Sequence, residues 1–274
     1  MDRPLAGFRA VNVSVNIPGP LAAARLTQLG ARVTKVEPPD GDPLQATSVE
    51  LYERFAAGQQ VVELDLKTDA GRDALDELLA EADVLVTSSR PSALARLGLG
   101  PGLASRHPRL VHVAIVGHHE PDQERAGHDL TYVSAFGAVS PPTLPQTLVA
   151  DIGGAERAVT AAVAMLLARE RGGEERYAEV ALAEAAETFS LPWIHGLTRP
   201  GGVLGGGLPF YGLYEAAGGW IALAALEPRF RERLVAELGA VPTSDSFRGR
   251  TPEEWERWAA ERDLPIAAVA TIQP

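Results

Sequence analysis

Two short stretches of the sequence carry side chains suited to acid–base chemistry. In "AGHDLTYVSAFG", His128 follows a glycine, and the near-neutral pKa of an imidazole suits a general acid or base. In "LVADIGGAERAV", Asp151 precedes Gly153, Gly154 and a run of small residues with a helical pattern. We therefore expect Asp151 to be the N-cap of a helix whose glycines let a ligand approach the free N–H groups.

Simpler interpretations exist for both residues. An isolated histidine is more often structural than catalytic, and Asp151 could do no more than cap its helix, which stabilises a helix by about 1 kcal/mol. The loop "HHEPDQERAGHD" also holds His118, His119, His128 and several carboxylates, which raises the possibility of a metal site. Because their spacing matches no compact pattern such as His-Glu-x-x-His, we expect no metal.

Composition narrows the class of protein. The chain has 274 residues, of which 46% are hydrophobic, a formal net charge of −11 and no cysteine, which excludes disulfides and a thiol nucleophile. Only two residues are lysines, so nucleic acid is not expected as a partner. The longest apolar runs are too short to cross a bilayer, and the first residues do not resemble a secretory signal. We expect a cytoplasmic protein without membrane attachment.

Strands and helices alternate along most of the chain, which predicts an α/β fold with a parallel, doubly wound, Rossmann-like sheet. The β-branched runs predicted as strands cover 8–15, 32–37, 60–67, 83–88, 109–117 and 176–182. The predicted helices cover 21–31, 69–82, 91–99, 130–139, 151–173 and 183–197. The sequence has no Gly-x-Ser-x-Gly elbow and no Walker loop, which disfavours hydrolases and nucleotide hydrolysis.

A glycine- and proline-rich stretch suggests where the chain divides. "RPGGVLGGGLP", residues 199–209, is the best candidate for a linker. Beyond it, 210–226 predicts two strands turned at Gly218 and Gly219, and 227–239 predicts a helix. We therefore expect a large Rossmann-like, ligand-binding domain over 1–198 and a smaller α+β domain over 210–274.

The ordered set of segments resembles CoA-transferase family III, and within it the alpha-methylacyl-CoA racemases. The similar stretches are "PLAGFRAVNVS", "GPLAAARLTQLGARVTKVEPPDGD", "VVELDLKTDAGRDALDELLAEADVLV", "RPSALARLGLGP", "HPRLVHVAIVG", "AGHDLTYVSAFG", "LVADIGG" and "GGGLPFYGLYEAAGGWIALAALEPRF". They cover most of residues 4 to 235 in the order of the family. Each stretch alone is weak evidence for the family, but the whole series in this order is specific to it.

The resemblance implies roles for three residues. Asp151 matches the aspartate that carries the acyl group and CoA in the transferases and acts as an acid or base in the racemases. His128 matches the racemase histidine, and Glu227 matches a glutamate supplied by the partner subunit to orient that histidine. Because transferases usually lack the His and Glu, the resemblance favours a racemase or epimerase that inverts the 2-methyl-bearing α-carbon of an acyl-CoA; CoA transfer through Asp151 is the alternative.

The resemblance also implies how substrate binds. Coenzyme A would enter as part of the substrate, with no tightly bound cofactor, and Arg90, Lys35 and Arg96 would contact its phosphates. The enolate formed between the two proton transfers needs hydrogen-bond donors, which we expect from the N–H groups at the Gly153–Gly154 helix start.

The resemblance also implies that the chain forms an interlocked homodimer. This chain departs from its relatives at 58–60, where a basic stretch is replaced by Gly-Gln-Gln, and at 117–125, where a glycine-rich loop is replaced. It also stops where the family's chain would return to the large domain, which leaves the completeness of the ring open. A repurposed biosynthetic enzyme and an inactive paralogue that only binds remain further alternatives.

Overall fold

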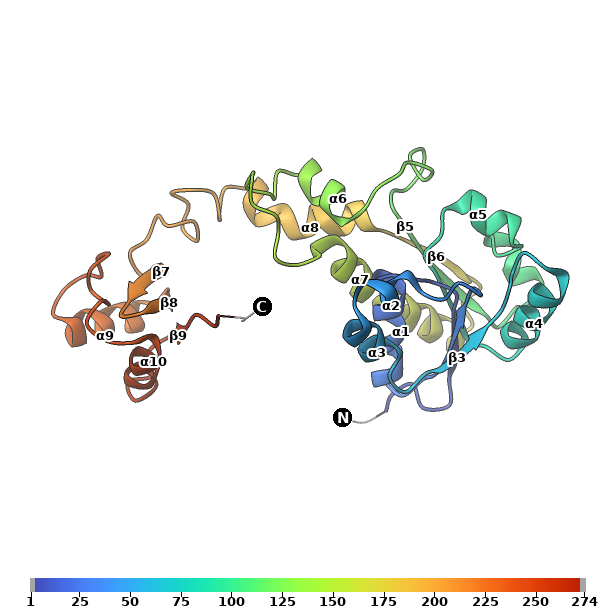
Figure 1. The fold of residues 1–274 in the computed structure, drawn as a ribbon, viewed down its shortest axis with the longest axis horizontal. Coiled ribbons are helices and arrows are strands. Elements are labelled where there is room, and N and C mark those ends of the chain that lie inside the picture. The colour runs from blue at the N-terminus through green and yellow to red at the C-terminus, as the bar shows by residue number, and fades with distance from the viewer. Residues whose placement is uncertain (1–2, 272–274) are drawn as a thin grey trace. The chain divides into compact units, whose positions relative to one another are not determined.

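The core of the large unit is a six-stranded, all-parallel sheet. The computed structural model describes residues 3–271. The strands are β1 (Arg9–Asn12), β2 (Arg32–Glu37), β3 (Gln60–Glu63), β4 (Val84–Thr87), β5 (Val111–Val116) and β6 (Tyr177–Ala181). Their order, β3-β2-β1-β4-β5-β6, confirms the predicted doubly wound sheet (Figure 1). The order reverses between β1 and β4, and ligands of such sheets bind beyond the strand ends at this point.

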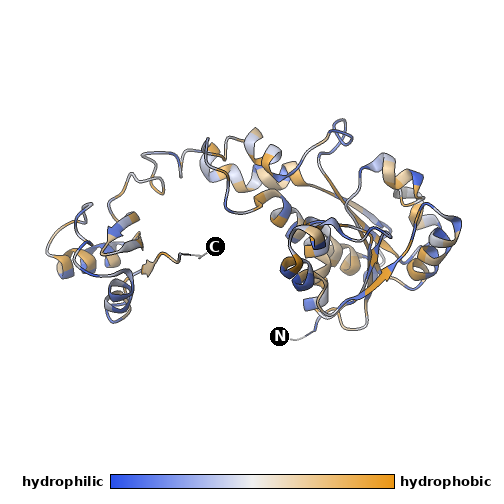
Figure 2. Cartoon of the chain, in the orientation of Figure 1, coloured by the Kyte–Doolittle hydropathy of each residue, from blue (hydrophilic) through white to orange (hydrophobic). Residues whose placement is uncertain are grey.

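Helices cover both faces of the sheet. One face packs against α1 (Pro18–Gln28) and α7 (Val149–Glu170), and the other against α4 (Asp69–Ala80) and α5 (Pro91–Arg96), with a 3-10 turn at Pro101–Ser105 (Figure 1). The two hydrophobic cores draw on alternate residues of the same strands: Ala10 faces the first and Val11 the second. Hydrophobic colouring accordingly runs along the sheet in Figure 2.

Local sequence explains several helix boundaries. Helix α4 begins after Thr68, whose hydroxyl accepts the N–H of Gly71 at 3.0 Å. Two short helices that we did not predict, α2 (Pro43–Thr47) and α3 (Val49–Ala56), follow β2 and pack beside α1. The helix expected over 130–139 is shorter, because α6 spans Asp129–Ala135.

The chain divides into two compact units after Ser190, within helix α8 (Leu182–Ile194). The predicted boundary was at 198, and the segment 199–209, made of turns and bends, falls inside the second unit. That unit contains β7 (Tyr211–Ala216), β8 (Gly219–Ala224), β9 (Ile266–Ala268), α9 (Pro228–Leu238) and α10 (Pro252–Ala260). Strands β7 and β8 form the predicted antiparallel hairpin, turned at Gly218 with φ of 81°.

Within residues 3–271, no helix has both the length and the apolar character needed to span a bilayer.

Candidate active site

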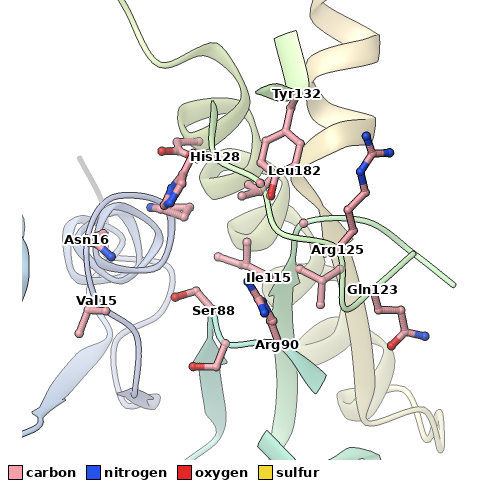
Figure 3. A pocket seen from close by; sticks show the side chains of 16 residues that line it. Val15, Asn16, Ser88, Arg90, Ile115, Gln123, Arg125, His128, Tyr132 and Leu182 are labelled. Atoms are coloured by element: carbon pink, nitrogen blue, oxygen red, sulfur yellow. The ribbon is translucent and has the colours of Figure 1, made fainter. Parts of the chain in front are cut away.

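A pocket of about 250 Å³ opens beyond the carboxyl ends of β1, β4 and β5. Asn16 comes from the loop after β1, Ser88 and Arg90 from the loop after β4, and Gly117 from the end of β5. The pocket therefore lies at the reversal of strand order, where an open α/β sheet binds its ligands (Figure 3).

His128 and Asp151, the two residues singled out for acid–base chemistry, both line this pocket. His128 is the residue before α6, with extended backbone at φ −140°. Its backbone N–H donates to the hydroxyl of Thr131 at 3.0 Å, and that hydroxyl donates to the His128 carbonyl at 2.7 Å. These bonds hold the backbone of His128 while its imidazole stays exposed at the pocket (Figure 3).

Asp151 is not the N-cap that its sequence suggested. Helix α7 begins at Val149, so Asp151 is its third residue, and the cap comes from another element. The carboxylate of Asp129, in α6, accepts the N–H of Ala150 at 2.6 Å and that of Asp151 at 3.0 Å. This frees the side chain of Asp151 from capping, because Asp129 already satisfies two of the free donors of the helix.

The surroundings of Asp151 change its acidity. Burial and the nearby negative charge of Asp129 raise the pKa of Asp151 to about 6, while His128 acts in the opposite direction. An ordinary aspartate is fully ionised at neutral pH, whereas this carboxyl exchanges its proton close to neutrality. Such a group can act as either an acid or a base in one reaction cycle.

Gly153 and Gly154 do not form the expected anion site. They are the fifth and sixth residues of α7, so the carbonyls of the preceding turn take their N–H groups. Both serve packing instead: an added Cβ would lie 2.3 Å from a ring carbon of Phe189 at Gly153, and 2.3 Å from Leu182 at Gly154. These glycines therefore allow α8 to approach α7 closely.

Tyr132, which sequence reasoning missed, is the deepest polar side chain at the pocket. It lies in α6, four residues after His128, and both residues line the pocket. The ring is buried at 4% exposure and contacts His118 edge-on, with ring centroids 5.3 Å apart. Burial and the charge of Asp151 raise the pKa of Tyr132, with Arg90 acting in the opposite direction. Its place near the start of the predicted 130–139 helix, four residues after His128, was the signal in the sequence that could have revealed it.

The structure separates the three residues expected to contact phosphates. Arg90 is exposed, precedes α5 and lines the same pocket as His128 and Asp151 (Figure 3). Arg96, in the last turn of α5, lines a different hollow together with Arg72 and Arg106. Of the three, only Arg90 therefore lines the pocket of His128 and Asp151.

Lys35 is a core residue. Its side chain is 1% exposed, and its ammonium forms ion pairs with Glu37 and, at 2.7 Å, with Asp42. Tyr52 completes the cluster, because its hydroxyl donates to Glu37 at 3.0 Å and the ammonium lies 4.9 Å from its ring centroid. With its charge already shared by two buried carboxylates, Lys35 does not present a cation to a phosphate, contrary to our expectation.

Glu227, the third residue implied by the resemblance, belongs to the second unit. It is exposed and is the residue before α9, where its side chain makes no capping bond.

The histidines of the 117–128 loop have separate partners. His118 packs on Tyr132, while His119 lies 3.4 Å from Glu179 and 3.3 Å from Glu184. Across residues 3–271, no group of three or more His, Asp or Glu side chains is arranged to hold a metal ion.

A second hollow adjoins the acid–base pocket and shares Val15 and Ser89 with it. It measures about 420 Å³ and lies beyond the ends of β2 and β3, with Val36, Pro38 and Leu64 among its apolar walls. Lys67, exposed at the end of the segment after β3, also lines it. The two hollows together follow the carboxyl edge of the sheet.

Comparisons with known proteins agree with this architecture. The model of the family described as "CoA-transferase family III" matches residues 5–243. The Homo sapiens alpha-methylacyl-CoA racemase is 31% identical over 306 residues, covering 98% of this chain and 78% of that protein. The probable fatty acyl-CoA transferase Rv3272 of Mycobacterium tuberculosis is 35% identical over 204 residues, covering 67% and 52%.

Solved structures share the fold. The crystal structure of the Mycobacterium tuberculosis protein Rv3272 superposes with a TM-score of 0.82, at 24% identity, over 99% of this chain and 86% of that chain. A CAIB/BAIF family protein from Brucella suis gives a TM-score of 0.81 at 21% identity, over 99% and 85%. From the family match over most of its length and the racemase relative at 31% identity, this chain belongs to CoA-transferase family III.

Proposed function

We propose that the chain is an acyl-CoA racemase or epimerase that inverts the α-carbon of a 2-methyl-branched thioester. The observation that carries the proposal is the meeting of His128 and Asp151 at one pocket, with the pKa of Asp151 raised to about 6. The identity to the human protein named alpha-methylacyl-CoA racemase supports the same assignment. An inactive paralogue would have no need to hold an acid–base pair at a pocket.

The chemistry needs two groups with complementary protonation states. In one direction the neutral imidazole of His128 takes the α-proton, the C–H electrons move into the thioester to form an enolate, and protonated Asp151 returns a proton to the other face. In the opposite direction the two residues exchange roles. A carboxyl with a pKa of about 6 is well matched to this alternation, because both of its forms are populated near neutral pH.

Coenzyme A enters this scheme as part of the substrate. The hollow beyond β2 and β3 has apolar walls suited to an adenine ring, and it joins the acid–base pocket at Val15 and Ser89. Arg90 would contact a phosphate, since an arginine fork suits phosphate oxygens, and Lys67 would be a further cation at the adenine end. We propose a homodimer in which Glu227 of one subunit orients the imidazole of His128 in the other.

CoA transfer is the second candidate. It is favoured by the carboxyl of Asp151 itself, which lines the pocket with its oxygens free of helix capping, and by relatives named as CoA-transferases. In that reaction the carboxylate would attack the thioester carbon and release CoA thiolate from a mixed anhydride.

One pair of measurements separates the two functions. A 2-methylacyl-CoA in deuterium oxide, followed by proton NMR with no second acid present, should lose its α-proton signal with the wild type and far more slowly with His128→Ala and Asp151→Ala. A hydroxylamine-trapped adduct on Asp151, found by mass spectrometry without α-proton exchange, would instead establish transfer. Equal exchange by the wild type and both variants would contradict the site assignment.

A further inference from the structure

An enolate at this pocket needs a hydrogen-bond donor for its oxygen, and the backbone N–H of Asp151, the α7 residue that lines the pocket, already has an acceptor. Asp129 takes the N–H groups of Ala150 and Asp151, and the N–H of Ile152 donates to the Leu148 carbonyl at 3.0 Å. The donor must therefore come from a side chain or from another segment.

Tyr132 differs from the other polar side chains that line the pocket. Of the sixteen lining residues, five are buried, and Tyr132 is the one among those five with a polar side-chain atom. Asn16 and Arg90 are exposed, and Ser88 and Gln123 are half-buried. A hydrogen bond from a buried donor is stronger electrostatically than one from a solvated donor, because water screens it less.

The ring of Tyr132 is also held in one place. An added Cβ at Gly117 would lie 2.5 Å from its hydroxyl oxygen, and one at Gly127 would lie 2.6 Å from its ring. The backbone at both glycines thus lies against the hydroxyl end of the phenol, and the His118 ring packs edge-on against it. Figure 3 shows the hydroxyl pointing from α6 into the pocket. A donor fixed in this way needs no reorganisation when charge develops.

We propose that Tyr132 is a further catalytic residue, whose phenolic O–H donates a hydrogen bond to the thioester oxygen and stabilises the enolate. This inference rests on the proposed function. When the α-proton leaves, the C–H electron pair becomes the C=C bond and the former carbonyl π pair moves onto oxygen. The phenol keeps its proton throughout, so Tyr132 is unchanged after each inversion. Its raised pKa is in keeping with that role, because it disfavours phenolate.

The test compares Tyr132→Phe with a matched control, Tyr177→Phe. Tyr177 is a half-buried phenol whose hydroxyl donates to Glu179 at 3.0 Å, and it does not line the acid–base pocket. Phenylalanine keeps the ring that contacts Gly117, Gly127 and His118. We expect kcat for α-proton exchange to fall about 100-fold or more in Tyr132→Phe with KM little changed, because a bond that strengthens in the transition state affects kcat. Tyr177→Phe should retain the wild-type rate.

A second readout does not depend on proton transfer by His128 or Asp151. Acetoacetyl-CoA forms a stable enolate that absorbs in the near ultraviolet, so its enolate fraction on the protein can be measured directly. We expect the wild type to raise this fraction over that of the free thioester at the same pH, and Tyr132→Phe to remove most of the increase. The pH at which the exchange rate reflects ionisation of Asp151 should stay the same in Tyr132→Phe, whereas a phenol that acted only by positioning Asp151 would shift it.

The outcomes distinguish this inference from the function beneath it. Absence of exchange by the wild type would overturn the racemase assignment and the role of Tyr132 together. If the wild type catalyses exchange and Tyr132→Phe keeps both the full kcat and the wild-type enolate fraction, the role of Tyr132 alone would be overturned. Equal losses in Tyr132→Phe and Tyr177→Phe, or no enolate stabilisation by the wild type, would also overturn it.

Discussion

The carboxylate of Asp129 accepts the backbone N–H of Asp151 at 3.0 Å, so one acidic residue caps the helix that carries the other. A second bond, from the N–H of Ala150 at 2.6 Å, fixes the same oxygen. The arrangement orients the start of α7 and places two negative charges close together. Asp129 therefore both positions Asp151 and raises its pKa.

Asp129→Asn should separate these two effects. An amide oxygen can still accept the N–H groups of Ala150 and Asp151, but the negative charge is gone, so the pKa of Asp151 should fall toward its ordinary value. Asp151 must be ionised to remove the α-proton from one of the two substrate enantiomers, so kcat/KM for that enantiomer should rise with pH near pH 6 in the wild type. In Asp129→Asn this rise should occur at lower pH. A pH profile of α-proton exchange measures this shift.

Asp129→Ala is the control for the capping role. It removes both the charge and the acceptor, and should lower the free energy of unfolding by about 1–2 kcal/mol. Denaturant titration would show this loss. An Asp129→Asn profile that overlays the wild type would contradict the electrostatic role of Asp129.

Asp151→Asn should stabilise the fold at neutral pH while it removes activity. The folded pKa of about 6 lies above the unfolded value, so the folded state binds more protons between about pH 4 and 6, and wild-type stability falls as pH rises through this window. Because an amide does not ionise, Asp151→Asn does not lose stability in this pH window. We expect the variant to gain about 1–2 kcal/mol of unfolding free energy at pH 7.5, and close to none at pH 4. Denaturation at both pH values checks the difference; a gain of the same size at pH 4 would contradict it.

Lys35→Met should destabilise the protein without acting on CoA affinity directly. Removing the ammonium leaves Glu37 and Asp42 buried beside each other without their cation, which should lower the unfolding free energy by about 3 kcal/mol or more. Adding Glu37→Gln should recover part of the loss, because one of the uncompensated charges is then removed. Thermal denaturation of the single and double variants measures the coupling. Weaker CoA binding by fully folded Lys35→Met would instead support the predicted contact between Lys35 and a phosphate of CoA.

Gly153→Ala and Gly154→Ala should differ although they are neighbours in one helix. At Gly153 the new methyl meets Phe189, which is 58% exposed and free to move aside, so the gain in helix propensity roughly offsets the adjustment. At Gly154 it meets Leu182, which is 9% exposed, and overpacking there should lower the unfolding free energy by about 1–3 kcal/mol. Equal stability of the two variants would show that packing does not distinguish the positions.

Much of the large unit followed from local patterns. Strands and helices of the observed length alternate in the sequence, and crossover handedness then leaves few possibilities besides a parallel sheet. The short helices α2 and α3 escaped prediction because they carry no long apolar period. The strand β9 (Ile266–Ala268) was also missed, since its three residues gain their strand character by pairing with β8.

For the site, residue types in the sequence singled out His128 and Asp151 as candidates for acid–base chemistry, and the structure places both at one pocket. The order of neighbouring motifs indicated the family. The resemblance implied a phosphate contact for Lys35, whose ammonium the structure pairs with buried carboxylates, and the helical pattern predicted Asp151 as an N-cap, whereas it is the third residue of α7. Both differences have one physical reason: whether a polar group is free depends on the partners that the folded chain brings against it. Asp129 reaches the start of α7 from 21 and 22 positions away, and Asp42 reaches Lys35 after a turn. The tertiary structure alone decided which charged side chains already have a partner. It also decided which of them line the pocket together with Tyr132.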